Sequence, residues 1–72
     1  MLKFPIRLET MKDINRFVGI CATCSGAVKL ADDEGHYVNG KSMLGAIYSL
    51  EFHTLYCLCD ADVASKFDDF RI

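Results

Sequence analysis

Four cysteines in two short pairs are the residues of this chain whose types and spacing most readily suggest chemistry. Cys21 and Cys24 form a C-x-x-C pair, and Cys57 and Cys59 form a C-x-C pair. Four thiolates can bind a zinc ion tetrahedrally, and two thiols at C-x-x-C spacing can cycle between dithiol and disulfide. A small cysteine-dependent metal-binding or redox protein is therefore one hypothesis for this chain.

The elements expected around these pairs favour unreactive thiols instead. The first pair lies on the apolar face and at the end of an expected helix, where the helix dipole raises a thiol pKa. The second pair alternates with Tyr56 and Leu58 along an expected strand over residues 54–59. If Tyr56 and Leu58 face the helices, the two pairs lie on opposite faces of the sheet and cannot share an ion. We therefore predict reduced thiols, no metal site and no cofactor.

A serine stands before the most regular apolar pattern in the chain. Met43, Ala46, Ile47 and Leu50 fall at i, i+3, i+4 and i+7, which is typical of a helix with one buried face. The hydroxyl of Ser42 can accept a hydrogen bond from a free N–H of the first turn. A phosphate on that hydroxyl would be stabilised by the helix dipole. Ser42 is thus expected to be the cap of this helix.

Two histidines could in principle accept a phosphoryl group or act as acid–base groups. His36 lies in an expected turn between two strands, and His53 lies between a helix and the last strand. Neither begins a helix, where a phosphate on the ring would meet free N–H groups. We predict that both are surface or partly packed histidines without a catalytic role.

Alternating apolar residues predict four strands, over residues 3–9, 28–30, 37–38 and 54–59. Pro5 cannot donate to a ladder, so it indicates that the first strand is an edge strand. A polar turn over residues 32–35 joins the second and third strands.

Three helical patterns separate or follow these strands. The first begins with a capping box at Thr10 and Asp13 and is expected to end at Gly26 in a left-handed conformation. The last follows Asp60 or Asp62 and is expected to bury Val63, Phe67 and Phe70 on one face.

The resulting order is β-α-β-β-α-β-α. It predicts an α+β domain with a four-stranded antiparallel sheet covered by helices on one face.

The composition predicts one small folded domain of 72 residues, 51% of them hydrophobic. A formal net charge of −2 gives no reason to expect nucleic acid or an anionic membrane as a partner. No apolar run approaches the roughly 20 residues of a membrane span, and Arg7 and Glu9 argue against a signal peptide. We therefore predict a cytoplasmic protein, and its oligomeric state stays open.

The run Lys41-Ser42-x-x-Gly45, followed by Ser49-Leu50, resembles the second helix of the HPr family, the phosphocarrier proteins of the bacterial sugar phosphotransferase system. The order of elements resembles that family over nearly the whole chain. The resemblance implies a single HPr-like domain over residues 1–72, with an open-faced β-sandwich fold.

In that family, a histidine in a Gly-x-His-x-Arg-Pro segment at the start of the first helix carries the phosphoryl group. The matching segment here, residues 9–14, contains no histidine, arginine or proline. The resemblance therefore implies a divergent member without histidine phosphotransfer, and not an enzyme.

The resemblance also implies a role for the second helix. Ser42 matches the family's regulatory serine, which a dedicated kinase phosphorylates in some bacteria. Ser42 is therefore either a helix cap alone or also a regulatory phosphorylation site. Partner contacts are expected at Lys41, Met43, Leu44 and Ile47. The expected partners are bacterial proteins of the sugar phosphotransferase network or an HPr-type serine kinase.

Overall fold

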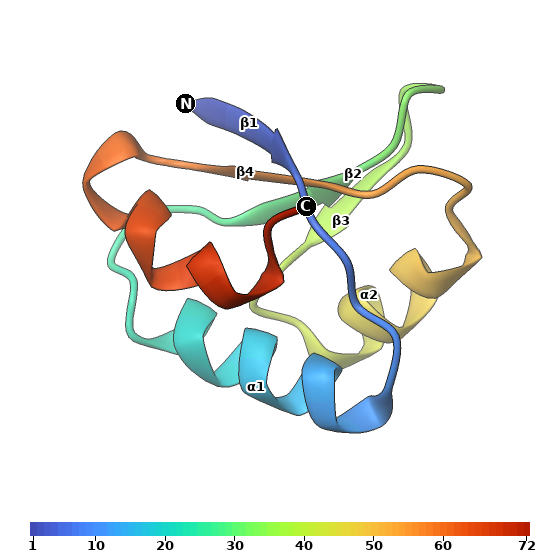
Figure 1. Ribbon diagram of the computed structural model, residues 1–72, viewed down its shortest axis with the longest axis horizontal. Coiled ribbons are helices and arrows are strands. Elements are labelled where there is room, and N and C mark those ends of the chain that lie inside the picture. The colour runs from blue at the N-terminus through green and yellow to red at the C-terminus, as the bar shows by residue number, and fades with distance from the viewer.

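The computed structural model describes residues 1–72 and places the helices on one side of a sheet (Figure 1). The strands are β1 (Leu2–Pro5), β2 (Lys29–Ala31), β3 (Tyr37–Asn39) and β4 (Tyr56–Cys59). The α-helices are α1 (Met11–Ala22) and α2 (Met43–Tyr48), and the 3₁₀-helices are η1 (Ser49–Glu51) and η2 (Ala61–Phe70). None of these helices is long and apolar enough to cross a membrane. The α+β class and the four-stranded antiparallel sheet predicted from the sequence are confirmed.

The sheet has the strand order β1-β4-β2-β3, so β1 and β3 are its edges. The edge position predicted from Pro5 is therefore confirmed. Regular pairing of β1 ends at Pro5, earlier than predicted, and only an isolated bridge joins Ile6 to Arg71. Ile6 and Leu8 nevertheless remain buried, as the alternation predicts.

The core lies between the inner face of the sheet and the helices. Two aromatic contacts organise it: the ring centroid of Phe17 is 5.2 Å from that of Phe67 and 5.7 Å from that of Phe70. Offset or edge-on ring pairs of this kind add to the stabilisation that burial alone provides. They hold α1 against η2, although the two segments are far apart in the sequence.

The predicted capping box of α1 is present. The Thr10 side chain accepts a hydrogen bond from the Asp13 N–H at 3.1 Å, and the Asp13 carboxylate accepts bonds from the Glu9 and Thr10 N–H groups at 3.0 and 3.3 Å. These bonds lower the pKa of the Asp13 carboxyl, and the bond from the Glu9 N–H has the largest effect. Side chains of the helix start therefore satisfy the N–H groups of Thr10 and Asp13.

The predicted left-handed Gly26 is wrong, because only Gly35 has a positive φ, of 91°. The helix instead ends at Ala22, with Thr23 as the right-handed C-cap. A Cβ atom at Gly26 would lie 2.5 Å from Oδ2 of Asp60, the end of an exposed side chain that can move aside, so the fold does not require a glycine here.

The last segment also differs from its prediction. It is a 3₁₀-helix that buries Ala64, Phe67 and Phe70, whereas Val63 is only partly buried. A 3₁₀-helix has 3.0 residues per turn, so side chains three apart share a face. Asp60 occupies the N-cap position without a side-chain cap bond.

The predicted buried face of α2 is wrong for three of its four residues. Ala46 is fully buried, but Met43, Ile47 and Leu50 are 38%, 36% and 44% exposed. The helix is only six residues long and tightens into η1 at Ser49, which is buried instead. Its contact with the sheet is made by small residues, since a Cβ atom on Gly45 would lie 2.9 Å from the Asn39 carbonyl oxygen.

We expect Gly45→Ala to destabilise the protein by about 1–3 kcal/mol, because the added methyl group pushes α2 away from β3. Gly19→Ala is the matched control, because a Cβ atom in the middle of α1 would meet nothing within 4 Å. It should stabilise the protein by about 0.5–1 kcal/mol through helix propensity. Urea unfolding followed by circular dichroism measures both. Equal stabilisation by the two substitutions would show that α2 does not depend on this close approach.

Candidate functional site

Ser42 joins the end of β3 to the start of α2. Its Oγ accepts a hydrogen bond from the Gly45 N–H at 3.2 Å, and its own N–H donates to the Asn39 carbonyl oxygen at 3.1 Å. The N-cap predicted for Ser42 is thus confirmed. The residue as a whole is partly exposed.

The neighbouring Lys41 is tied to two other segments. Its N–H donates to Oδ1 of Asn39 at 2.9 Å, and its Nζ donates to the Cys24 carbonyl oxygen at 2.7 Å. The second bond links the start of α2 to the loop that follows α1. The ammonium group carries three donors, so it retains two for other acceptors.

Apolar side chains next to Ser42 form an exposed surface, which we call the α2 surface and define as Met43, Leu44, Ile47 and Tyr48. Leu44 is 80% and Tyr48 is 59% exposed, and Met43 and Ile47 are each more than one-third exposed. Single exposed apolar residues are common, but several on one short helix are typical of an interaction site. The structure therefore brings together Ser42 and three of the predicted contact residues on one helix.

The prediction that the two cysteine pairs lie on opposite faces of the sheet is wrong. Cys57 and Cys59 are fully buried and belong to the same core as the first pair. The register explains this, because Cys57 lies opposite Phe4 on one neighbouring strand and opposite Leu30 on the other. Phe4 and Leu30 are buried on the side of the sheet that faces the helices, and Cys57 shares that side. Tyr56 and Leu58, which are partly exposed, therefore point to the opposite side of the sheet.

The chemistry of the four thiols is set by this burial. All are free cysteines, and burial raises the pKa of the Cys21 thiol to about 12, with Cys24 adding to the effect. Burial also raises the pKa of Cys57 and of Cys59. No group of three or more histidine, cysteine, aspartate or glutamate side chains is placed to hold a metal ion. The geometry therefore offers no donor set for zinc, and the raised pKa values of Cys21, Cys57 and Cys59 disfavour redox exchange at these three thiols.

We expect none of the four cysteines to react rapidly with Ellman's reagent in the folded protein at about pH 8, because a buried neutral thiol is a poor nucleophile. All four should react once the protein is unfolded in guanidinium chloride. Absorbance of the released thiolate measures both. Rapid reaction of one thiol in the folded state would identify a reactive cysteine and restore the redox hypothesis.

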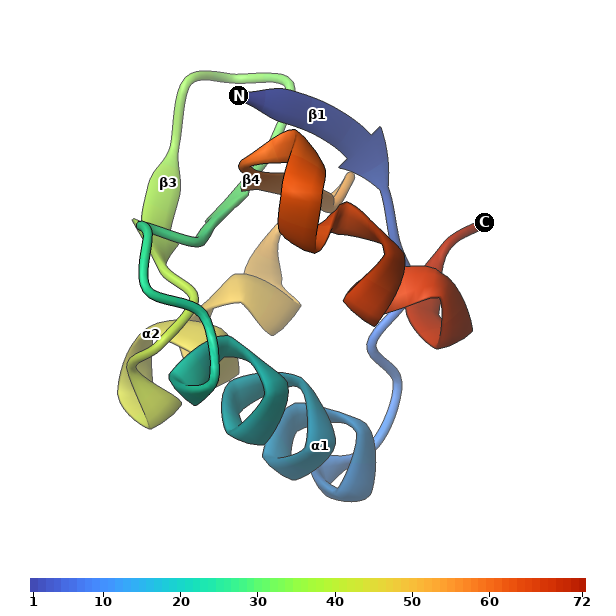
Figure 2. The same ribbon diagram turned by 90° about the vertical axis from the view of Figure 1, so that its left-hand side faces the viewer.

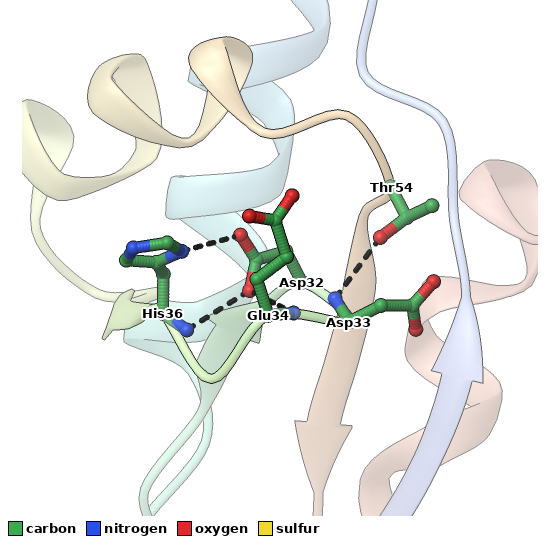
Figure 3. A network of polar contacts seen from close by, with 5 residues as sticks. All are labelled: Asp32, Asp33, Glu34, His36 and Thr54. Carbon is green, nitrogen blue, oxygen red and sulfur yellow. Dashed lines mark hydrogen bonds and ion pairs between the residues drawn. The ribbon is translucent and has the colours of Figure 1, made fainter.

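A polar network at the β2–β3 turn is the feature that sequence reasoning missed (Figure 3). Asp32 is only 7% exposed although it is an acid. Its Oδ1 accepts hydrogen bonds from the N–H groups of Glu34 and His36, both at 2.9 Å, and its Oδ2 lies 2.8 Å from Nδ1 of His36. An aspartate at the start of a polar turn is the usual signal for such a motif.

The same turn is fastened to the rest of the fold. The Asp33 N–H donates to Oγ1 of Thr54 at 3.1 Å, and the His36 ring stacks on Phe52 with centroids 6.1 Å apart. A hollow of about 200 Å³ beside the His36 ring is lined by Asp32, Glu34, His36, Tyr48, Glu51, Phe52 and His53. These residues include no serine, threonine or cysteine nucleophile. The pair of Asp32 and His36 therefore has the geometry of a turn-stabilising contact.

The hydrogen bonds decide the acidity of Asp32. Burial alone raises the pKa of its carboxyl, but the bonds from the His36 ring and from the two backbone N–H groups outweigh burial and lower the pKa below 3.8. Since the folded-state pKa is lowered, the contribution of Asp32 to stability is complete above the ordinary pKa. It is lost as the pH falls through the folded-state value.

We expect the free energy of unfolding to decrease as the pH falls from about 4 to about 2, and to decrease less in Asp32→Asn over the same range. Asp62→Asn is the control, because that exposed carboxylate forms no hydrogen bond or ion pair. Urea titrations at several pH values give the measurement. An Asp32→Asn profile parallel to that of the wild type would mean that the network does not stabilise the fold.

Comparison with known proteins adds no relative to this picture. No family model, curated protein or solved structure matches the chain.

Proposed function

We propose that this chain is a regulatory, protein-binding module of HPr type, cytoplasmic and not an enzyme, without histidine phosphotransfer. Its partners are proteins of the bacterial sugar phosphotransferase network or an HPr-type serine kinase. The order of elements and the helices on one side of the sheet agree with what the sequence resemblance implies. The Lys41-Ser42-x-x-Gly45 motif agrees as well, because Ser42 caps the helix and Gly45 permits its close approach to β3.

The observation that carries the proposal is the exposed α2 surface. A helix attached through Gly45 and Ala46 leaves its larger apolar side chains in water. Covering such side chains with a partner gains about 25 cal/mol for each Å² of apolar area removed from water. Leu44 offers the most exposed side chain of this set. Protein binding is thus the use that best fits this helix.

The start of α1 supports the loss of phosphotransfer. The capping box already uses the N–H groups of Glu9, Thr10 and Asp13, so fewer donors are left at this helix start to bind a phosphate. The Asp13 carboxylate would also repel a phosphoryl group at this position. His36 is held in the β2–β3 turn by Asp32, and no histidine stands in the first turn of α1.

Position and charge support Ser42 as the modification site. The residue is partly exposed, whereas Ser49 of the same motif is buried and donates to the Ala46 carbonyl oxygen at 2.6 Å. A phosphate on Ser42 adds nearly two negative charges at neutral pH beside the α2 surface. Burying that surface against an apolar partner then becomes costly, so phosphorylation would control binding.

We expect incubation with an HPr-type serine kinase and ATP to place one phosphate on Ser42, measured by tandem mass spectrometry. Ser42→Ala should stay unmodified, and Leu44→Asp should be modified more slowly because it places a charge on the α2 surface. Circular dichroism of both variants shows whether the fold is retained. Ser42→Ala should cost about 1 kcal/mol of stability through the lost cap.

Two outcomes would contradict the proposal. The first is a phosphate on the exposed Ser25 or Ser65 with none on Ser42. The second is an acid-labile phosphoryl group on His36 or His53 after incubation with phosphoenolpyruvate and the first enzyme of the system.

A further inference from the structure

The face of the sheet that lies away from the helices carries two lysines over two aromatic rings. Lys3 Nζ lies 4.6 Å from the ring centroid of Tyr56, and Lys29 Nζ lies 4.8 Å from that of Tyr37. The register puts these four residues on one face. Lys3 and Lys29 both pair with Leu58, which is two residues from Tyr56 and shares its face, and Tyr37 pairs with Ala31, which is two residues from Lys29. Asp33 lies against the Tyr56 side chain, so the lysine that stands apart from this carboxylate is Lys29, next to β3.

A hollow of about 310 Å³ lies at the β3 side of this face. It is lined by Ala27, Val28, Lys29, Tyr37, Asn39 and Lys41. These residues include two lysines and no carboxylate. Lys29 approaches only the Tyr37 ring, and Lys41 uses one donor on the Cys24 carbonyl oxygen, so both retain donors for an anion.

The backbone of β3 is open beside this hollow. The Gly40 N–H donates to the Val28 carbonyl oxygen, and the Asp32 N–H donates to the His36 carbonyl oxygen. In this register the backbone N–H and C=O groups of residues 36, 38 and 40 point toward β2. Because backbone groups alternate along a strand, Tyr37 N–H and C=O and Asn39 N–H point away from the sheet. In Figure 2, β3 forms the outer edge of the sheet.

The opposite edge of the sheet, at β1, is partly covered. The chain's own last residues cover part of β1, since Arg7 N–H donates to the Phe70 oxygen at 2.8 Å and Ile72 N–H donates to the Pro5 oxygen at 3.3 Å. Edge strands that remain open are sites where another strand can add. Of the two edges, the one at β3 is both open and next to the lysine-lined hollow.

We propose that β3 binds an acidic peptide segment in an extended conformation, which adds to the sheet as a fifth strand. The free groups of Tyr37 and Asn39 are spaced to pair with a peptide backbone, and alternate carboxylates of the added strand reach Lys29 and Lys41. A single-stranded nucleic acid would match the lysines and rings but would leave the backbone groups of β3 unpaired. The inference rests on Lys29 and Tyr37 and not on the α2 surface, so it can fail or hold independently of the proposed function.

The test uses a short fluorescent peptide that alternates glutamate with valine, with fluorescence anisotropy as the measure of binding. Lys29→Glu should weaken binding about tenfold, because it replaces an attraction by a repulsion at an exposed site. Lys12→Glu makes the same charge change on the exposed surface of α1 and should weaken binding less than twofold. A peptide in which lysine replaces glutamate should not bind.

Amide hydrogen exchange of the wild-type protein gives the second measurement. Saturating peptide should slow exchange at Tyr37 and Asn39, whereas Val38, already paired with β2, should change little. Equal affinity in Lys29→Glu and Lys12→Glu, or binding without slower exchange at Tyr37 and Asn39, would overturn the proposal. Tighter binding of a thymidine oligonucleotide than of the peptide would assign the face to nucleic acid instead.

Discussion

The structure depends on which way the side chains of β4 point. This strand lies between β1 and β2, so its register sets the inner face of both neighbours. Cys57 and Cys59 point inward, and their small thiols leave the bulk of the core to aromatic residues such as Phe17 and Phe67. A one-residue slip of β4 would exchange its buried and exposed residues, since the side-chain period of a strand is two.

The same constraint decides what the thiols can do. A C-x-x-C pair and a C-x-C pair meet in one buried core, where burial raises the pKa of Cys21, Cys57 and Cys59 and no group of side chains is placed to hold a metal ion. Their spacing suggested metal or redox chemistry, and their surroundings make them packing residues. The four cysteines therefore contribute to this fold as small apolar side chains that fill the core.

The two proposed binding surfaces, in contrast, lie in parts of the molecule outside the core. The α2 surface stays outside because α2 contacts the sheet through Gly45 and Ala46. The β3 edge stays open because β3 is the last strand of the sheet and its outward groups have no partner strand. The hydrogen bonds of Asp32 fasten the β2–β3 turn, which leads into β3.

The sequence by itself determined what depends on neighbours a few residues away. The Thr10–Asp13 capping box, the Ser42 cap and the alternation of each strand are local interactions, so residue type and spacing suffice to predict them. The hydrogen bonds of Asp32 are equally local, because they reach residues only two and four positions away, so the aspartate at the start of the turn could have predicted them. Only the tertiary structure decided which face of β4 is buried and which side chains of α2 are covered. An alternating or helical pattern states which residues share a face, but the packing of distant segments determines whether that face meets protein or water.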